Sequence, residues 1–308
     1  MLRYAAKRIL FMIPTVIGST FLVYLLVFLV PGDPVLSLAG DKRLSPASIA
    51  AIRDQYNLDD PFFVQYVKYL GNVLHGDFGR DFNNNSVSTL IRTALPYTIA
   101  LALTAFILKL VIGLSLGAWA GLRKGGLPDK INLVFTIFFL AVPGFLIAYF
   151  AQYFVGIKLG LFPISGPRLG YPIAFIMPAL VLALETASPL ARLTRTSLVD
   201  VLRSGYIVTA RAKGASPSRV IWRHALRNAS LPVVTYLGLS LASLLGGSVL
   251  IETIFNLPGL GGTLSTAIGA QQGPVVVGVS VFLLLFYLVA ALAVDLLYPI
   301  IDPRVRHA

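Results

Sequence analysis

The stretch GPVVVGVSVFLLLFYLVAALAV, residues 273–294, contains no charged side chain. As a helix rising 1.5 Å per residue, a run of about 20 apolar residues crosses a hydrocarbon layer of about 30 Å. Three more uncharged runs reach that length, namely Ile9–Val30, Ile131–Ile157 and Ala229–Ile251. These four runs predict membrane-spanning helices.

Two further runs carry one charge each. Pro96–Leu122 contains Lys109, and Leu169–Ala191 contains Glu185. An ionisable side chain is tolerated in a span when it faces the interior of a helix bundle. We therefore expect an all-α integral membrane protein with six transmembrane helices.

Composition agrees with this class. The 308 residues are 56% hydrophobic and only 12% charged, whereas soluble domains carry roughly 25% charged residues. A soluble enzyme, a disordered chain and a fibrous protein are excluded on this ground. The chain has no cysteine, so it has no disulfide framework, thiolate metal site or thiol nucleophile.

The first apolar run could also be a signal peptide. Basic residues precede it, and Ser37-Leu38-Ala39 offers a small-residue cleavage site. However, the 22 apolar residues of Ile9–Val30 exceed the roughly 7–15 of a signal sequence. We therefore predict a retained span.

Basic residues predict the orientation of the spans. With the N-terminus inside, the inner segments hold 16 Lys and Arg residues, eight of them between Arg192 and Arg227. The two short outer loops hold only Lys158 and Arg168. Because short cytoplasmic loops are enriched in Lys and Arg, both termini are expected in the cytoplasm.

The long outer segment, 31–95, is predicted to be structured. Ser45-Pro46 is typical of a helix start, and a second helical pattern opens at Pro61. These amphipathic helices could rest on the outer membrane interface. Alternatively, they could form a docking surface for an outside partner.

One motif resembles an enzyme signature. Gly113-Leu-Ser115-Leu-Gly117 matches the G-x-S-x-G pattern of serine hydrolases, so an intramembrane serine protease is a remote alternative. No histidine is expected at the depth of Ser115 to act as a base. Gly113, Gly117 and Gly121 instead have the spacing of a close helix–helix contact. No P-loop, dinucleotide fingerprint or zinc motif is present either, so we expect no catalytic residue, no metal and no cofactor in this chain.

The segment 192–228 is the most informative. Its pattern predicts two short helices that meet at Gly214, the second one capped by Ser216-Pro217. A basic helix-turn-helix could bind nucleic acid, but its tether between two spans opposes that function. An elbow held below a membrane instead suits docking into a partner's groove.

Here the sequence resembles a known family, the permeases of ABC importers of the peptide type. The resemblance rests on Tyr206–Ser216 with His224–Ala229 and Pro232; Pro31–Pro34 with Gly76–Gly79; Glu252–Gly261; and Asp295–Tyr298 with Asp302–Arg306. Within the family, these segments are similar to the first of the two permease subunits of dipeptide and oligopeptide importers. Val208 and Thr209 stand where the broader family begins this loop with Glu-Ala.

The resemblance implies a type I ABC importer permease fold in the plasma membrane of a prokaryote. It divides the chain into 1–30, an outer helical insertion at 31–95, and a transmembrane core at 96–308 with its coupling loop at 192–228. The implied partners are a second permease, two cytoplasmic ATPase subunits that hold ATP and Mg²⁺, and an extracytoplasmic binding protein. The implied ATPase-docking residues are Thr209, Ala210, Arg211, Ala212, Lys213, Gly214, Ala215 and Ser216.

Lys109 and Glu185 are expected at similar depths in their spans, about 20 Å from the outer end at 1.5 Å per residue. From there a lysine cannot reach either surface, so it needs a partner. Glu185 is one candidate. A structural ion pair, a lining of the peptide path and a contact with the second permease remain open for this pair.

Two alternatives to peptide import remain. Related permeases carry glutathione, nickel chelates or sugars. A stand-alone secondary transporter would need inverted repeats or several intramembrane charges, and no repeat is evident.

Overall fold

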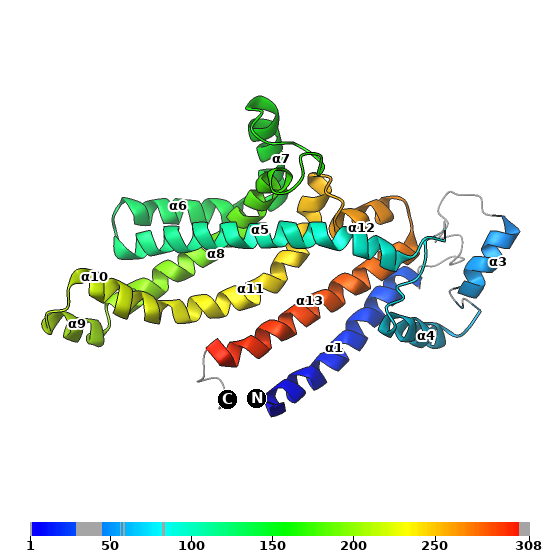
Figure 1. Ribbon diagram of the computed structural model, residues 1–308, viewed down its shortest axis with the longest axis horizontal. Coiled ribbons are helices and arrows are strands. Elements are labelled where there is room, and N and C mark those ends of the chain that lie inside the picture. The colour runs from blue at the N-terminus through cyan, green and yellow to red at the C-terminus, as the bar shows by residue number, and fades with distance from the viewer. Residues whose placement is uncertain (1, 29–44, 56, 58, 82–83, 302–308) are drawn as a thin grey trace. The chain divides into compact units, whose positions relative to one another are not determined.

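The structure is a computed structural model that describes residues 2–28, 45–55, 57, 59–81 and 84–301 (Figure 1). This part of the chain is helical and contains no strand, apart from an isolated bridge between Arg80 and Ser86. Pro31–Pro34, Ser37–Ala39 and Asp302–Arg306 lie outside the described residues. The chain divides into two compact units, 1–99 with 256–292 and 100–255 with 293–308.

The first unit joins helices from both ends of the sequence. They are α1 (Leu2–Phe28), α3 (Pro46–Gln55), α4 (Phe62–Leu74), the start of α5 (Val87–Leu122), α12 (Leu260–Gly269) and most of α13 (Gly273–Ile301). Tyr24 of α1, Tyr66 of α4 and Val281 of α13 share one buried cluster. The Tyr66 hydroxyl donates to the Ile17 carbonyl oxygen at 2.9 Å. The helices predicted at Ser45-Pro46 and at Pro61 are thus confirmed as α3 and α4, and α4 packs against two long apolar helices.

The second unit contains the remaining helices. They are the rest of α5, α6 (Leu127–Ala141), α7 (Gly144–Phe150) with its π-helical continuation η1 (Ala151–Lys158), α8 (Ile173–Leu202), α9 (Gly205–Ala212), α10 (Pro217–Arg219), the π-helical segment η2 (Val220–Ala225) and α11 (Leu226–Ile254). α8 packs along both α6 and α11. Lys109, Glu185, the glycines at positions 113, 117 and 121, and the segment 192–228 all lie in this unit.

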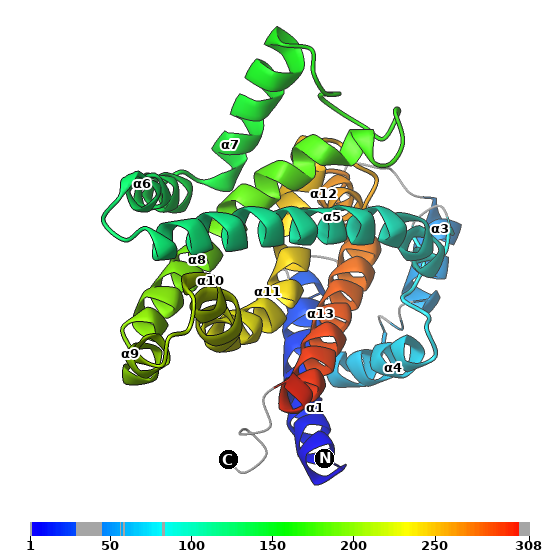
Figure 2. The ribbon, with the colours of Figure 1, turned by 60° about the vertical axis from the view of Figure 1, so that its left-hand side comes forward.

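Among the described residues, four helices are long and apolar enough to span a membrane: Arg8–Val27, Val87–Leu122, Ile173–Leu202 and Gly273–Val294. The expected straight span at Ile131–Ile157 is instead bent by 102° between α6 and α7, which makes it a possible fifth (Figure 2). The bend has a local cause. Val142 is extended (φ −89°, ψ 121°) and precedes Pro143, and a proline disfavours helical backbone at the residue before it.

The sixth expected span, Ala229–Ile251, lies within α11. The side chains of residues 239, 241–243, 245 and 247 in this helix lie outside the described ones. The all-helical membrane class is therefore confirmed, and the count of six stays a prediction.

Candidate functional site

The elbow, which we define as Thr209–Ser216, is a tight turn between two helices. Gly214 has φ +80°. Its N–H donates to the Arg211 carbonyl at 2.9 Å, and the Ala215 N–H donates to the Ala210 carbonyl at 3.1 Å. This pair of bonds is the Schellman arrangement, which places a left-handed residue, usually glycine, after the helix. The predicted glycine break is confirmed.

The second arm of the elbow begins as its sequence predicts. The Ser216 side chain accepts a hydrogen bond from the Arg219 N–H at 3.4 Å, and Pro217 occupies the first turn. The Val220 N–H donates to the Ser216 carbonyl. From Pro217 the helical backbone continues through η2 into α11. The elbow is thus built into the start of a long helix.

Apolar packing fixes the elbow to its unit. Ile207 of α9 is fully buried in a cluster with Leu198 of α8 and with Val220, Ala225 and Ala229 of the second arm. Ala215 packs against the same cluster. One face of the elbow is therefore held by the ends of α8 and α11.

The other face of the elbow is open. Six of its residues are exposed and two, Ala210 and Ala215, are partly buried; the exposed ones are Thr209, Arg211, Ala212, Lys213, Gly214 and Ser216. Close by in the chain, Val208 is 60% and Trp222 is 72% exposed. The sequence reasoning missed Trp222, and the available signal was a single tryptophan within a basic helical segment. The exposed residues of the elbow combine positive charge with small side chains, and an exposed aromatic ring lies close by in the sequence.

A row of three glycines in α5, which are Gly113, Gly117 and Gly121, packs closely against α8. A Cβ at Gly113 would lie 2.7 Å from a Leu190 side-chain atom, and one at Gly117 would lie 2.5 Å from the Ala191 carbonyl oxygen. A Cβ at Gly121 would lie 3.1 Å from Leu198 atoms. The predicted close helix contact is confirmed. Ser115 between them donates to the Val111 carbonyl of its own helix.

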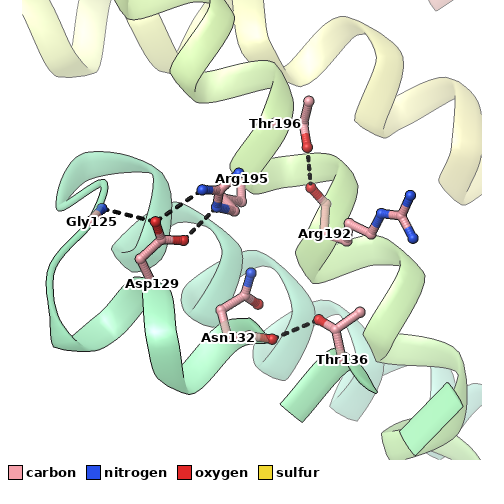
Figure 3. Close-up of polar contacts among 7 residues, drawn as sticks. All are labelled: Gly125, Asp129, Asn132, Thr136, Arg192, Arg195 and Thr196. Carbon is pink, nitrogen blue, oxygen red and sulfur yellow. Dashed lines mark hydrogen bonds and ion pairs between the residues drawn. The ribbon is translucent and has the colours of Figure 1, made fainter. Parts of the chain in front are cut away.

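An ion pair joins the first turn of α6 to the C-terminal part of α8 (Figure 3). Arg195 donates from Nε and a terminal nitrogen to the two Asp129 carboxylate oxygens, the second bond measuring 2.9 Å. The Gly125 N–H also donates to Asp129, at 2.8 Å. The partners are 66 residues apart in sequence, so periodicity could not pair them. A carboxylate in the first turn of α6 was the only sign.

A cavity of about 270 Å³ lies beside this ion pair, between α6 and α8. Its lining consists of Asp129, Lys130, Asn132, Leu133, Thr136, Arg192, Arg195 and Thr196. Figure 3 shows the Asn132 amide between the Asp129–Arg195 pair and Thr136. No motif in the sequence indicated this cavity.

The structure does not bring Lys109 and Glu185 together. Lys109 is 1% exposed, and its Nζ lies 5.0 Å from the ring centre of Tyr236 of α11. Glu185 is exposed on α8, where a Cβ at Gly144 would overlap its carboxylate. The expected similar depth was not sufficient to pair them, because Lys109 lies against α11 and Glu185 against the start of α7. A path-lining role for either residue stays a prediction.

Within the described residues, no group of three or more His, Asp or Glu side chains is arranged to hold a metal ion.

Two family models match the chain. The "Binding-protein-dependent transport system inner membrane component" family matches residues 113–307, and its N-terminal companion matches residues 1–102. The elbow, the glycine row and the cavity all lie within the first match.

Relatives match over the whole length. The chain is 37% identical to the glutathione transport system permease protein GsiC of Salmonella typhimurium over 308 residues, covering 100% of both chains. It is 37% identical to the oligopeptide transport system permease protein AppB of Bacillus subtilis, again covering 100% of both. Identity to the dipeptide transport system permease protein DppB of Bacillus subtilis is 35%, covering 99% of this chain and 98% of that one.

The fold also matches solved structures. The inward-facing MetNI methionine ABC transporter aligns with a TM-score of 0.56 at 20% identity, covering 69% of this chain and 96% of that one. An amino acid ABC transporter aligns with a TM-score of 0.54 at 16% identity, covering 70% and 94%. The chain belongs to the family of inner membrane components of binding-protein-dependent transport systems.

Proposed function

We propose that this chain is the permease subunit of an ATP-driven ABC importer for peptides, forming half of its translocation pore. The observation that carries the proposal is the full-length similarity to oligopeptide and dipeptide permeases at 35–37% identity. In this scheme the chain moves cargo without catalysing a reaction. ATP and Mg²⁺ are bound and used by separate ATPase subunits.

The elbow is the element that receives the ATPase motion. Its exposed face supports this role, because Gly214 and Ala212 allow a partner backbone to approach while Arg211 and Lys213 can pair with acidic groups. Its buried face contacts the ends of α8 and α11. A displacement of the elbow would therefore reach two long helices directly.

The remaining parts of the assembly follow from the family. A second permease would complete the pore, and an extracytoplasmic binding protein would deliver the cargo. Six spans with both termini in the cytoplasm, in a prokaryotic plasma membrane, are supported by the distribution of basic residues. Lys109 and Glu185 are candidates for lining the path, because an ionisable group within a span commonly marks one.

Glutathione is the second candidate cargo, since the GsiC relatives match at the same identity. Both cargoes are tested by reconstituting the chain with its second permease, ATPases and binding protein in liposomes. We expect uptake of di- or oligopeptides that requires ATP and all partners. Uptake by this chain alone under an ion gradient would instead identify a secondary transporter, and uptake of glutathione without peptides would replace the cargo.

The orientation gives a labelling prediction that uses the absence of native cysteine. The Asp59 side chain is 79% exposed in the outer segment, and Ser218 is exposed in α10. In intact cells, Asp59→Cys should react with a membrane-impermeant maleimide, whereas Ser218→Cys should react only after the cells are opened. The reverse pattern would overturn the orientation and the elbow's access to ATPases.

A further inference from the structure

The cavity between α6 and α8 contains more positive charge than the chain itself neutralises. Lys130 and Arg192 are both exposed at its lining, and neither forms an ion pair with an acidic side chain of the described residues. The only carboxylate in the lining, Asp129, already pairs with Arg195. The lining therefore carries two positive charges that no acidic side chain of the described residues neutralises.

The cavity also contains an acceptor without a donor. Asn132 is 2% exposed, and its Oδ1 has no hydrogen-bond partner. The Thr136 hydroxyl donates to the Asn132 backbone carbonyl at 2.7 Å and the Thr196 hydroxyl to the Arg192 carbonyl at 2.9 Å, so both hydroxyls are used by their own helices. Since a buried acceptor normally has a partner, a fitting ligand carries a donor as well as a negative charge.

An apolar stripe leads away from the cavity along α6. Lys130, Leu133, Ile137 and Leu140 follow one another at spacings of three and four, which places them on one helix face. The three apolar residues are each more than half exposed, at 58%, 59% and 53%. From Lys130 to Leu140 the stripe is about 15 Å long at 1.5 Å per residue, half of a hydrocarbon layer of about 30 Å.

We propose that this cavity binds one anionic phospholipid with a hydroxyl-bearing headgroup of the phosphatidylglycerol type. The phosphate lies between Lys130 and Arg192, the glycerol hydroxyl donates to Asn132 Oδ1, and an acyl chain follows Leu133, Ile137 and Leu140. A soluble anion would leave the stripe uncovered. The assignment requires only that the chain lies in a membrane and does not depend on its cargo.

The first test counts retained lipids by native mass spectrometry of the full-length chain with its partner subunits, after delipidation and addition of phosphatidylglycerol. We expect one tightly held lipid per chain. Lys130→Gln with Arg192→Gln should weaken its retention by about 30-fold, since each cation contributes roughly fivefold to binding an anionic lipid. The matched control removes two exposed arginines near the elbow, Arg219→Gln with Arg223→Gln, and should leave retention unchanged. Equal retention in both double variants would overturn the site.

The second test examines the hydroxyl. The wild-type chain should retain phosphatidylglycerol better than phosphatidylmethanol, which has the phosphate but no hydroxyl donor. Asn132→Leu should remove this preference, whereas the control variant Arg219→Gln with Arg223→Gln should keep it. An absent preference in the wild type would contradict the role of Asn132.

The last test separates lipid from other occupants. Inorganic phosphate should not displace the retained lipid, whereas efficient displacement would identify a simple anion site. A photo-crosslinker at Leu133 should label phosphatidylglycerol in vesicles that contain it. Labelling of a partner subunit at that position would show that a protein covers the cavity and would overturn the proposal.

Discussion

Gly214→Trp should abolish ATP-driven uptake while the chain still inserts into the membrane. Gly214 adopts φ +80° and nothing lies within 4 Å of the position its Cβ would take. The first side-chain atom of a larger residue there meets no atom of this chain, and Gly214 itself is exposed. Left-handed backbone costs a non-glycine residue about 1–2 kcal/mol, which a membrane domain can tolerate. The loss should therefore be in ATPase docking, measured by uptake and by co-purification of the ATPases.

Gly125→Trp is the matched control for this substitution. Gly125 has φ +78° and equally open surroundings, but it lies in the turn between α5 and α6. It carries the same backbone strain and the same added ring at another place. We expect uptake close to wild type. If both variants lose uptake, strain alone explains the loss; if Gly214→Trp transports normally, the elbow does not dock.

Gly117→Ala should destabilise the chain more than its size suggests. The added Cβ would lie 2.5 Å from the Ala191 carbonyl oxygen and 2.7 Å from Thr194 Cβ. The nearest of these atoms is backbone, so α5 and α8 must move apart. Overpacking of this kind costs about 1–3 kcal/mol, and it opposes the roughly 1 kcal/mol that alanine gains over glycine within a helix. Thermal unfolding in detergent should show a clear loss of stability.

Gly246→Ala separates packing from helix propensity. Gly246 lies inside α11 with nothing within 4 Å of a Cβ. The substitution adds the same methyl group to a helix interior, so we expect unchanged or slightly increased stability. Equal behaviour of the two variants would mean that the glycine row does not hold α5 against α8.

Local rules were enough to predict the elements of the fold that depend on neighbouring residues. The Ser216-Pro217 start, the glycine break at Gly214 and the row from Gly113 to Gly121 are each encoded within a few positions. The bend at Pro143 was also locally encoded, yet an uninterrupted apolar run concealed it. Hydropathy indicates how long an apolar segment is, but it does not show whether the helix is straight.

Contacts between distant segments were harder to predict. Lys109 and Glu185 were expected at a similar depth, but an expected depth leaves the direction of a side chain around its helix undetermined, and Lys109 faces Tyr236 instead. Asp129 and Arg195 pair across 66 residues, and the cavity beside them exists only once α6 lies on α8. A single sequence contains no direct record of such pairings.

The continuity of the second arm has a mechanical consequence. From Pro217 to Ile254 the backbone is helical throughout, with the π-helical segment η2 near its start and Pro232 inside α11. A movement at Ser216 would therefore be passed along one continuous helix to its far end. That end is anchored, because Gln152 Nε2 donates to the carbonyls of both Ile254 and Ile164. A movement of the elbow would thus reach, through one helix, the contact that holds the loop before α8.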